Sequence, residues 1–395
     1  MRIEKNGWNR LKQSKINGCQ TVSGGAIGSL IFFLKEREMK KLTLVLLVLF
    51  LASAVVFAGG DKDSGKVKIA LLMRNMDEQF LKDYSDNVKK MAAGKNVELN
   101  VQDARSDSAT QLTQLETALN QGYKYFVIIP CVSELSEQMN KLIKEKGGAA
   151  SYSNIQPTVA ALKVGPNFFY ASSPEFVGGR YQGQLVADYF DKHADKAPGK
   201  VLNMLHINGQ MGHPAQVNRR AGLMAELATR GYTVNIIAED TANWTPDQAN
   251  EKMNAWIASF RGKFNVVAAQ NDGMALGAVQ SLIQNGFVKE NTSDGTRLTI
   301  PVFGVDATGD AIASMKRNEL YATVLQDAVG QSAAAFDVIY QMASGTYKPG
   351  NPAGGTPAAT APIDEPPAND ASIIGQCYLV PFVPVDKNSA YYKAR

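Results

Sequence analysis

Little net charge remains in this 395-residue chain outside its N-terminal segment. The formal net charge is +4, but residues 1–58 contribute nine Lys and Arg against three Glu. Residues 59–395 therefore hold 32 basic and 34 acidic side chains, a net charge of −2. Proteins that bind nucleic acid concentrate positive charge on one surface, so this balance argues against a nucleic-acid partner.

Cysteine is also scarce, with three residues in the chain and only Cys131 and Cys377 after residue 58. These two lie far apart in apolar runs, which favours two buried thiols, although a disulfide stays possible in an exported protein. No cysteine directly follows the apolar run 42–57, which disfavours a lipid anchor. The chain also lacks a zinc-ligand spacing, a heptad pattern, a short-period repeat and a glycine-rich phosphate loop, and we predict no cofactor.

The N-terminal segment contains the pattern of an export signal. Met39-Lys40-Lys41 is a short basic start, residues 42–57 are almost all apolar, and Val56 and Ala58 are small. We expect a signal peptide over 39–58, cut after Ala58, and a periplasmic protein; a retained membrane anchor is the alternative. Residues 1–38 fit no targeting scheme, so we interpret them as a spurious upstream extension before a true start at Met39.

From residue 66 onward, short apolar runs alternate with stretches of helical periodicity. This alternation predicts an α/β fold with two successive sets of parallel strands, each covered by helices on both faces. The predicted strands are 67–73, 97–101, 125–129, a weaker one reaching 154, 168–171, 201–207, 233–237, 265–269, 301–305, 322–325 and 378–383. Residues 157–165 are expected to be a loop, and 349–372, rich in Pro, Gly and Ala, a flexible or poorly structured loop.

Polar and aromatic side chains follow the carboxyl ends of these strands. Parallel strands of an open α/β sheet place such residues on one rim, and two facing rims would line a cleft. These side chains suit an uncharged sugar. Carboxylates and amides can form hydrogen bonds with its hydroxyls, and aromatic side chains can cover the apolar faces of a pyranose ring. The candidates are Glu78, Phe80, Asn154, His213, Arg219, Trp244, Asn271, Asp306 and Gln326.

Each candidate also has a simpler structural explanation. Asp306 could cap the helix that follows it, and Arg219, next to Arg220, could lie on a solvated helix face. The two asparagines could be turn residues, and the two aromatic residues could belong to hydrophobic cores. His213 is less easily explained in this way, because it lies in a short polar loop with glycines around it.

From Val67 onward the chain resembles the periplasmic glucose/galactose-binding proteins of bacterial sugar ABC transporters. The segments that carry the resemblance are 212–214, 240–244 with 252–256, 271–279 and 301–307. It implies a type I periplasmic binding protein fold, with two Rossmann-like lobes joined by a three-strand hinge that closes around the ligand. It also implies an N-terminal lobe of 66–171 plus 327–378 and a C-terminal lobe of 172–326 plus 379–395.

By the same resemblance, Phe80 and Trp244 sandwich the sugar ring and the polar candidates bind its hydroxyls. Three positions depart from the family. Glu78 stands in place of an aspartate, Gln326 in place of an asparagine, and Ala215 in place of an aspartate near the anomeric end. Residues 195–200 are too short for the calcium loop of the best-known members, and Asn265 replaces a glutamate ligand, so we expect no metal site.

The resemblance implies a monomeric protein that binds glucose or galactose and delivers it to ABC permease membrane subunits and to a chemoreceptor. A different monosaccharide or a related polyol is the alternative ligand. The effector domain of a transcription regulator would need a helix-turn-helix ahead of residue 66, where the sequence has an export signal instead. A sugar-acting enzyme could use Glu78 and Asp306 as paired carboxylates, but no nucleophile–base pair accompanies them.

Overall fold

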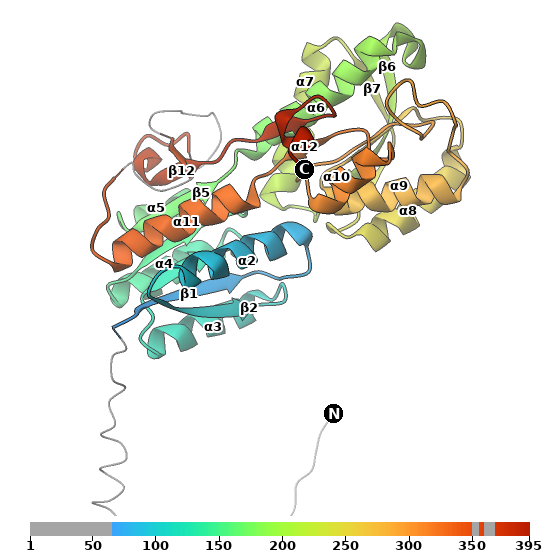
Figure 1. Ribbon diagram of the computed structural model, residues 1–395. Helices are drawn as coiled ribbons and strands as arrows, with labels where there is room; N and C mark the ends of the chain where they lie inside the picture. The colour runs from blue at the N-terminus through green and yellow to red at the C-terminus, as the bar shows by residue number, and fades with distance from the viewer. Residues whose placement is uncertain (1–64, 350–354, 359–367) are drawn as a thin grey trace, which may run out of the picture. The chain divides into compact units, whose positions relative to one another are not determined.

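The computed structural model describes residues 65–349, 355–358 and 368–395 (Figure 1). The predicted extension 1–38, the predicted signal 39–58 and much of 349–372 lie outside the described residues. In the described part, no helix has the length and apolar character needed to span a bilayer.

The first sheet has seven strands, of which all but one run parallel. In spatial order they are β11 (Thr356–Pro357), β12 (Cys377–Leu379), β5 (Phe168–Ser172), β4 (Ala149–Tyr152), β3 (Tyr125–Ile128), β1 (Val67–Met73) and β2 (Val97–Asp103). Successive side chains of β1 enter two different cores, as the twofold period of a strand requires. Ile69 and Leu71 pack with one core, and Ala70 and Leu72 with the other.

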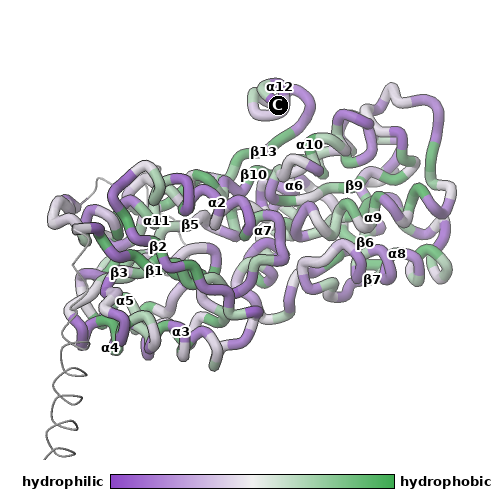
Figure 2. Tube along the Cα trace, turned by 60° about the horizontal axis from the view of Figure 1, so that its bottom comes forward, coloured by the Kyte–Doolittle hydropathy of each residue, from purple (hydrophilic) through white to green (hydrophobic). Residues whose placement is uncertain are grey.

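Helices cover both faces of this sheet. On one face α2 (Gln79–Ala93) and α11 (Ala328–Ala343) lie side by side (Figure 1). The other face holds α3 (Ser108–Asn120), α4 (Leu135–Glu145) and α5 (Val159–Lys163). Polar and apolar residues alternate along these helices, so each buries one side (Figure 2).

The second set of strands forms a parallel sheet of four with a two-stranded antiparallel ribbon beside it. The strands are β7 (Thr233–Thr241), β6 (Val201–Asn208), β8 (Val266–Ala269) and β9 (Val302–Phe303), then β10 (Thr323–Leu325) and β13 (Val383–Val385). Two parallel bridges, Phe303 to Ala322 and Asp306 to Leu325, join the ribbon to the chain of β9.

Helices also cover both faces of the second sheet. On one face lie α6 (Glu175–Lys192) and α7 (Pro214–Thr229). On the other lie α8 (Pro246–Phe260), α9 (Asp272–Gln284), α10 (Gly309–Lys316) and the short α12 (Ala390–Lys393). The α/β fold with mainly parallel sheets, predicted from the alternation, is confirmed.

The chain passes between the two sheets three times. The connections are β5 to α6, β10 to α11 and β12 to β13. We refer to these as the three crossing segments. The lobe boundaries given above stay a prediction.

Three segments differ from the sequence predictions. The loop expected at 157–165 contains α5, whose first turn is capped by the Thr158 hydroxyl accepting from Ala161 N. The strand expected over 378–383 is two strands, β12 and β13, which belong to different sheets. The loop expected at 349–372 contains β11, which pairs with β12 at the edge of the sheet, and Ala358 behind it is buried.

Gly179 allows α6 and α7 to pack backbone against backbone. A Cβ atom built at this position would lie 2.1 Å from the carbonyl oxygen of Arg219. We expect Gly179→Ala to lower the free energy of unfolding by roughly 1–3 kcal/mol, because the helices must separate. Urea unfolding measures this against Gly309→Ala, where no atom lies within 4 Å. Equal losses in the two variants would contradict the packing argument.

Candidate functional site

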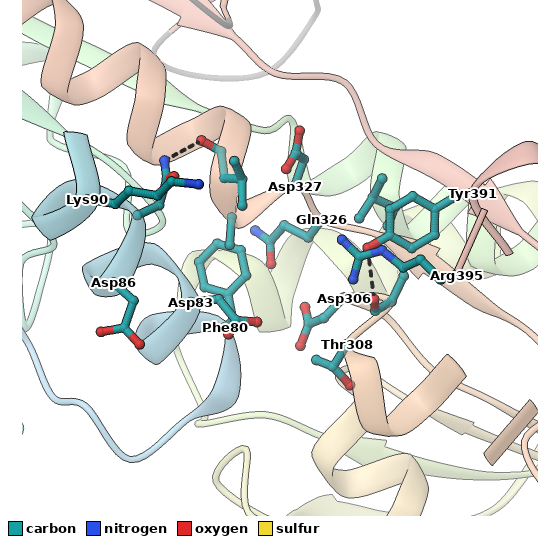
Figure 3. Close-up of a pocket in the computed structure, with 15 residues that line it drawn as sticks. Phe80, Asp83, Asp86, Lys90, Asp306, Thr308, Gln326, Asp327, Tyr391 and Arg395 are labelled. Carbon is teal, nitrogen blue, oxygen red and sulfur yellow. Dashed lines mark hydrogen bonds between the residues drawn. The ribbon is translucent and has the colours of Figure 1, made fainter. Parts of the chain in front are cut away.

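Three candidate side chains, Phe80, Asp306 and Gln326, line one cavity of about 360 Å³ (Figure 3). Phe80 comes from α2 on the first sheet, whereas Asp306 and Gln326 follow β9 and β10 of the second. Tyr391 of α12 lines the same cavity, and its hydroxyl donates to Ala307 O at 3.3 Å. Residues that belong to both sheets and their helices therefore line one cavity.

The Asp306 carboxylate faces this cavity with its hydrogen-bonding capacity unused. It is 8% exposed and accepts no hydrogen bond from any described residue; Arg219 Nη1 is 3.9 Å away. Burial raises its pKa well above the usual value, and Asp272 and Glu78 add to the rise, whereas Arg219 opposes it. Asp306 does not cap α10, because the Thr308 hydroxyl takes that position and accepts from Ala311 N.

Arg219 is buried, with 3% exposure, and is not on a solvated face. Its Nε donates to Glu175 Oε2 at 2.7 Å, its Nη1 to Gln270 O at 2.6 Å and its Nη2 to Gln326 Oε1 at 2.8 Å. Burial works to lower its pKa, but Glu175 and Asp306 outweigh burial and raise it. The guanidinium therefore stays charged and held in one orientation.

His213 is the N-cap of α7, and the hydrogen bond to its Nδ1 fixes the tautomer of its neutral ring. Nδ1 accepts from Ala215 N at 3.1 Å, so in the neutral ring the proton lies on Nε2. Burial lowers the pKa of His213 well below its usual value, and the charges of Arg74 and Arg219 lower it further. Nε2 is buried and has no partner among the described residues.

Trp244 lies beside His213, with their rings edge to face at a centroid distance of 5.2 Å. The indole belongs to a hydrophobic core cluster and leaves no room for a side chain at Gly209. It also contacts the Arg219 guanidinium, whose Cζ lies 5.8 Å from the ring centroid. Its Nε1 is buried and, within the described chain, without a partner. Trp244 therefore packs in a hydrophobic core, and its buried indole N–H has no hydrogen-bond acceptor among the described residues.

The two candidate asparagines differ in how their side chains are used. Asn271 is the N-cap of α9: its Oδ1 accepts from Met274 N, and its Nδ2 donates to Trp244 O at 3.1 Å. Asn154 follows β4 with a φ of 61°, and its Oδ1 is buried without a partner in the described residues. Asn271 therefore has a structural role as a helix cap, which differs from the turn residue that its simpler explanation proposed.

Backbone strain accompanies three of the candidates. Asn154, Trp244 and Asp306 have positive φ angles of 61°, 67° and 123°. Such conformations cost roughly 1–3 kcal/mol for residues with a side chain and gather at functional sites. Their coincidence with predicted site residues supports a role for these positions beyond packing.

Glu78 is the N-cap residue of α2, but its side chain does not cap the helix. Instead Oε1 accepts from Arg74 Nη2 at 2.5 Å, in an ion pair whose arginine is 4% exposed. Arg74 Nε is another buried atom that no described residue satisfies. The sequence analysis missed Arg74, although it directly follows the strand 67–73 and obeys the same strand-end rule.

Most of the nine predicted residues come together. Contacts connect His213 with Trp244 and connect Arg219 with Gln326; Arg219 also has Trp244 and Asp306 as neighbours. Asn271 joins this group through its hydrogen bond to Trp244 O. The charge of Glu78 acts on the Asp306 carboxyl, and Phe80 lines the same cavity as Asp306 and Gln326. Asn154 makes no hydrogen bond to the other eight, and its backbone N donates to Ser172 Oγ at 3.1 Å.

Glu175 is a further residue of the site that the sequence analysis missed. It is 1% exposed, pairs with Arg219 and accepts from Gln326 Nε2 at 3.1 Å. Burial raises its pKa, and the charge of Arg219 opposes that rise. It follows the strand 168–171 closely, so extending the strand-end rule to that strand would have found it.

Residues 69–346 match the periplasmic binding protein domain family, which is most of the chain. The chain belongs to this family. Its fold is the type I periplasmic binding protein fold that the sequence predicted.

Three proteins that are similar to this chain are named as binding proteins. The xylitol-binding protein of Mycolicibacterium smegmatis is 28% identical over 282 residues, 71% of this chain and 74% of its own. The D-galactose/methyl-galactoside binding periplasmic protein of Haemophilus influenzae is 25% identical over 285 residues, 70% of this chain and 82% of its own. An ABC transporter solute binding protein from Bacillus halodurans, with bound myo-inositol, has a TM-score of 0.66 at 24% identity and covers 84% of this chain and 99% of its own.

Protein groups occupy the region where the resemblance would place calcium. Asn265 Nδ2 donates to the carbonyl oxygens of Lys196 and Val201, at 3.0 and 3.2 Å, and Lys196 Nζ pairs with Asp294. Among the described residues, no three His, Cys, Asp or Glu side chains come together as metal ligands. An amide donor and a lysine cation do not form a calcium site.

We therefore expect added calcium to leave the melting temperature of this binding protein unchanged. Thermal unfolding after chelator treatment, with and without calcium, measures this, and magnesium is the matched control. A rise that appears at micromolar calcium, and not with magnesium, would contradict the prediction, because selective binding to the folded state stabilises it.

Proposed function

We propose that this binding protein holds one uncharged sugar or polyol between the strand ends of its two sheets. The observation that carries the proposal is that candidate residues hold three of the buried side-chain atoms that lack a partner among the described residues: Asn154 Oδ1, His213 Nε2 and Trp244 Nε1. Buried polar atoms almost always have a partner, so each of these needs one. All three belong to residues singled out from the sequence as sugar-binding.

The chemistry of these atoms suits hydroxyl groups. His213 Nε2 and Trp244 Nε1 are donors, whereas Asn154 Oδ1 and the Asp306 carboxylate are acceptors. A hydroxyl both donates and accepts, so a polyhydroxylated ligand can satisfy both kinds. A hydrogen bond to a charged group contributes roughly 1.5–3 kcal/mol, which makes Asp306 the strongest single contact we expect.

Within this class, a hexose such as glucose or galactose is our first choice, and another monosaccharide or a polyol is the alternative. The relatives bear the names of a pentitol and a hexose, and one structure holds a cyclitol, which are all uncharged and rich in hydroxyls. Ala215 is 1% exposed and offers only a methyl group where the hexose pattern has an acid. This change favours a ligand that needs no acceptor at the anomeric end.

An enzymatic role is less well supported. Arg74 engages Glu78 at 2.5 Å, so this carboxylate is not free to act as a general acid or base. The relatives compared above are named as binding proteins, and none of those names describes an enzyme. We infer a non-catalytic protein that releases its ligand unchanged.

We further propose that the protein works in the periplasm as the binding component of an ABC importer. Its partners would be the permease membrane subunits and a chemoreceptor, with no nucleic acid. The H. influenzae relative is named as periplasmic, and the B. halodurans protein as part of an ABC transporter. The protein would act as a monomer that carries one ligand at a time.

Calorimetric titration of residues 59–395 tests the function. The panel is glucose, galactose, ribose, xylitol and myo-inositol, with sodium gluconate as a charged control. We expect saturable heat at one ligand per chain for at least one neutral compound, and a recovered ligand that chromatography shows to be unchanged. Absence of heat with every neutral compound would overturn the ligand class, and conversion of the ligand would overturn the non-catalytic role.

A further inference from the structure

The three crossing segments meet at one side chain, that of Arg219. Glu175 begins α6 after the first crossing, and Arg219 Nε donates to it at 2.7 Å. Gln326 lies in the second crossing and accepts from Nη2 at 2.8 Å. Phe382 lies in the third, and the Arg219 Cζ atom is 5.8 Å from its ring centroid. A single guanidinium therefore contacts all three segments.

Two consecutive glycines of α6 hold this arrangement close together. A Cβ atom at Gly178 would lie 2.8 Å from the Phe382 ring, and one at Gly179 would lie 2.1 Å from the Arg219 carbonyl oxygen. The backbone of α7 and the third crossing segment are thus both pressed against α6 beside Glu175. Movement of Arg219 relative to α6 is sterically restricted.

The other side of Arg219 faces the proposed ligand site. A guanidinium has five N–H groups, and the protein takes up three of them through Glu175, Gln270 O and Gln326. The guanidinium also lies 3.9 Å from the Asp306 carboxylate and 5.8 Å from the Trp244 ring centroid, and both of these residues belong to the ligand site. Arg219 consequently connects the ligand-facing groups with the crossing segments.

Resting on the function proposed above, we propose that Glu175 is a positioning residue that fixes Arg219 between the ligand and the three crossing segments. Glu175 then sets how favourable lobe closure is, without contributing to the choice of ligand. Domain closure around a ligand depends on a few residues at element ends that connect the domains. When closure after ligand binding becomes less favourable, more of the complexes stay open and release the ligand, and the apparent affinity falls by the same factor for every ligand.

Glu175→Gln tests this proposal, because it keeps the shape of the side chain and removes its charge. We expect the dissociation constants of all ligands that the wild type binds to rise by a common factor of roughly 5–150. In stopped-flow tryptophan fluorescence, the rise should come from faster dissociation at an unchanged association rate. The matched control is Glu226→Gln, which breaks an ion pair with Arg180 between the same two helices, away from the crossing segments.

The outcomes separate the proposal from alternatives. Unchanged affinity, a change that differs between ligands, or an equal effect of Glu226→Gln would overturn it. A purely structural role would lower the active fraction while leaving the dissociation rate of the remaining protein as it was. If Glu175→Gln does not fold, Phe382→Leu loosens the third segment and should give the same ligand-independent pattern. A wild type that binds no panel member would refute the proposed function itself.

Discussion

An Arg219→Met variant should lose about 3–5 kcal/mol of unfolding free energy, since it breaks a buried ion pair by removing one partner. The pair is almost completely enclosed, with side-chain exposures of 3% for Arg219 and 1% for Glu175. Without the guanidinium, the Glu175 carboxylate loses the Arg219 charge that offsets its burial. Urea unfolding followed by circular dichroism measures the loss.

The double variant Arg219→Met with Glu175→Leu is the control for this interpretation. Replacing both members of a buried pair by apolar residues is often close to neutral, so the double variant should recover most of the lost stability. A double variant as unstable as the single one would show that lost packing, and not the loss of the charge pair, dominates. Neither variant should bind the ligand normally, because Arg219 also holds Gln326 in place.

Asp306→Asn should weaken ligand binding by roughly 1.5–3 kcal/mol, or about 10- to 150-fold, because it replaces a charged acceptor by a neutral one. The substitution keeps the size of the side chain, so the cavity stays intact. Calorimetric titration measures the change. Asp310→Asn, on the exposed first turn of α10, is the matched control and should bind as the wild type does.

The same Asp306→Asn variant should be more stable than the wild type at pH 8. The pKa of Asp306 is raised in the folded state, chiefly by burial, so ionisation of this group opposes folding. The contribution of the protonated Asp306 carboxyl to the stability of the fold is fully present below the unfolded pKa of about 4, and it is lost as the pH rises through the folded pKa. The difference between variant and wild type should therefore disappear near pH 4. A variant that is less stable at pH 8 would contradict the assigned direction.

The periodicity of the sequence was sufficient to predict most strands of the two parallel sheets. Residues 69–73 are all apolar because both faces of β1 are covered there, and successive residues such as Leu71 and Leu72 enter different cores. The strand-end rule also selected the candidate residues, because parallel strands place their carboxyl ends on one rim. His213 and Asp306 were selected in this way, and their role in ligand binding stays a prediction.

The sequence could not show how the polar groups are shared between protein and ligand. Glu175 and Arg74 neutralise Arg219 and Glu78, and such long-range pairing leaves no local pattern. Thr245 illustrates the same limit on a smaller scale. It stands at the N-cap of α8, a position where threonine is favoured as a cap, but its hydroxyl donates to Ala242 O and does not cap the helix.

The C-terminal part of the chain was the least predictable. Residues 377–385 form one apolar run in the sequence but two strands in different sheets, since the third crossing interrupts the run at 380–382. β11 consists of a threonine and a proline, which have no strand periodicity, and pairing with the exposed edge of β12 forms it. Neither feature is encoded within a short window of sequence.

A crystal structure of residues 59–395 with the tightest-binding neutral sugar or polyol tests the central claim most directly. We expect ligand hydroxyls within hydrogen-bonding distance of His213 Nε2, Trp244 Nε1 and the Asp306 carboxylate, with Phe80 against the ring or carbon chain. A ligand bound elsewhere, with these atoms still unpaired, would contradict the account.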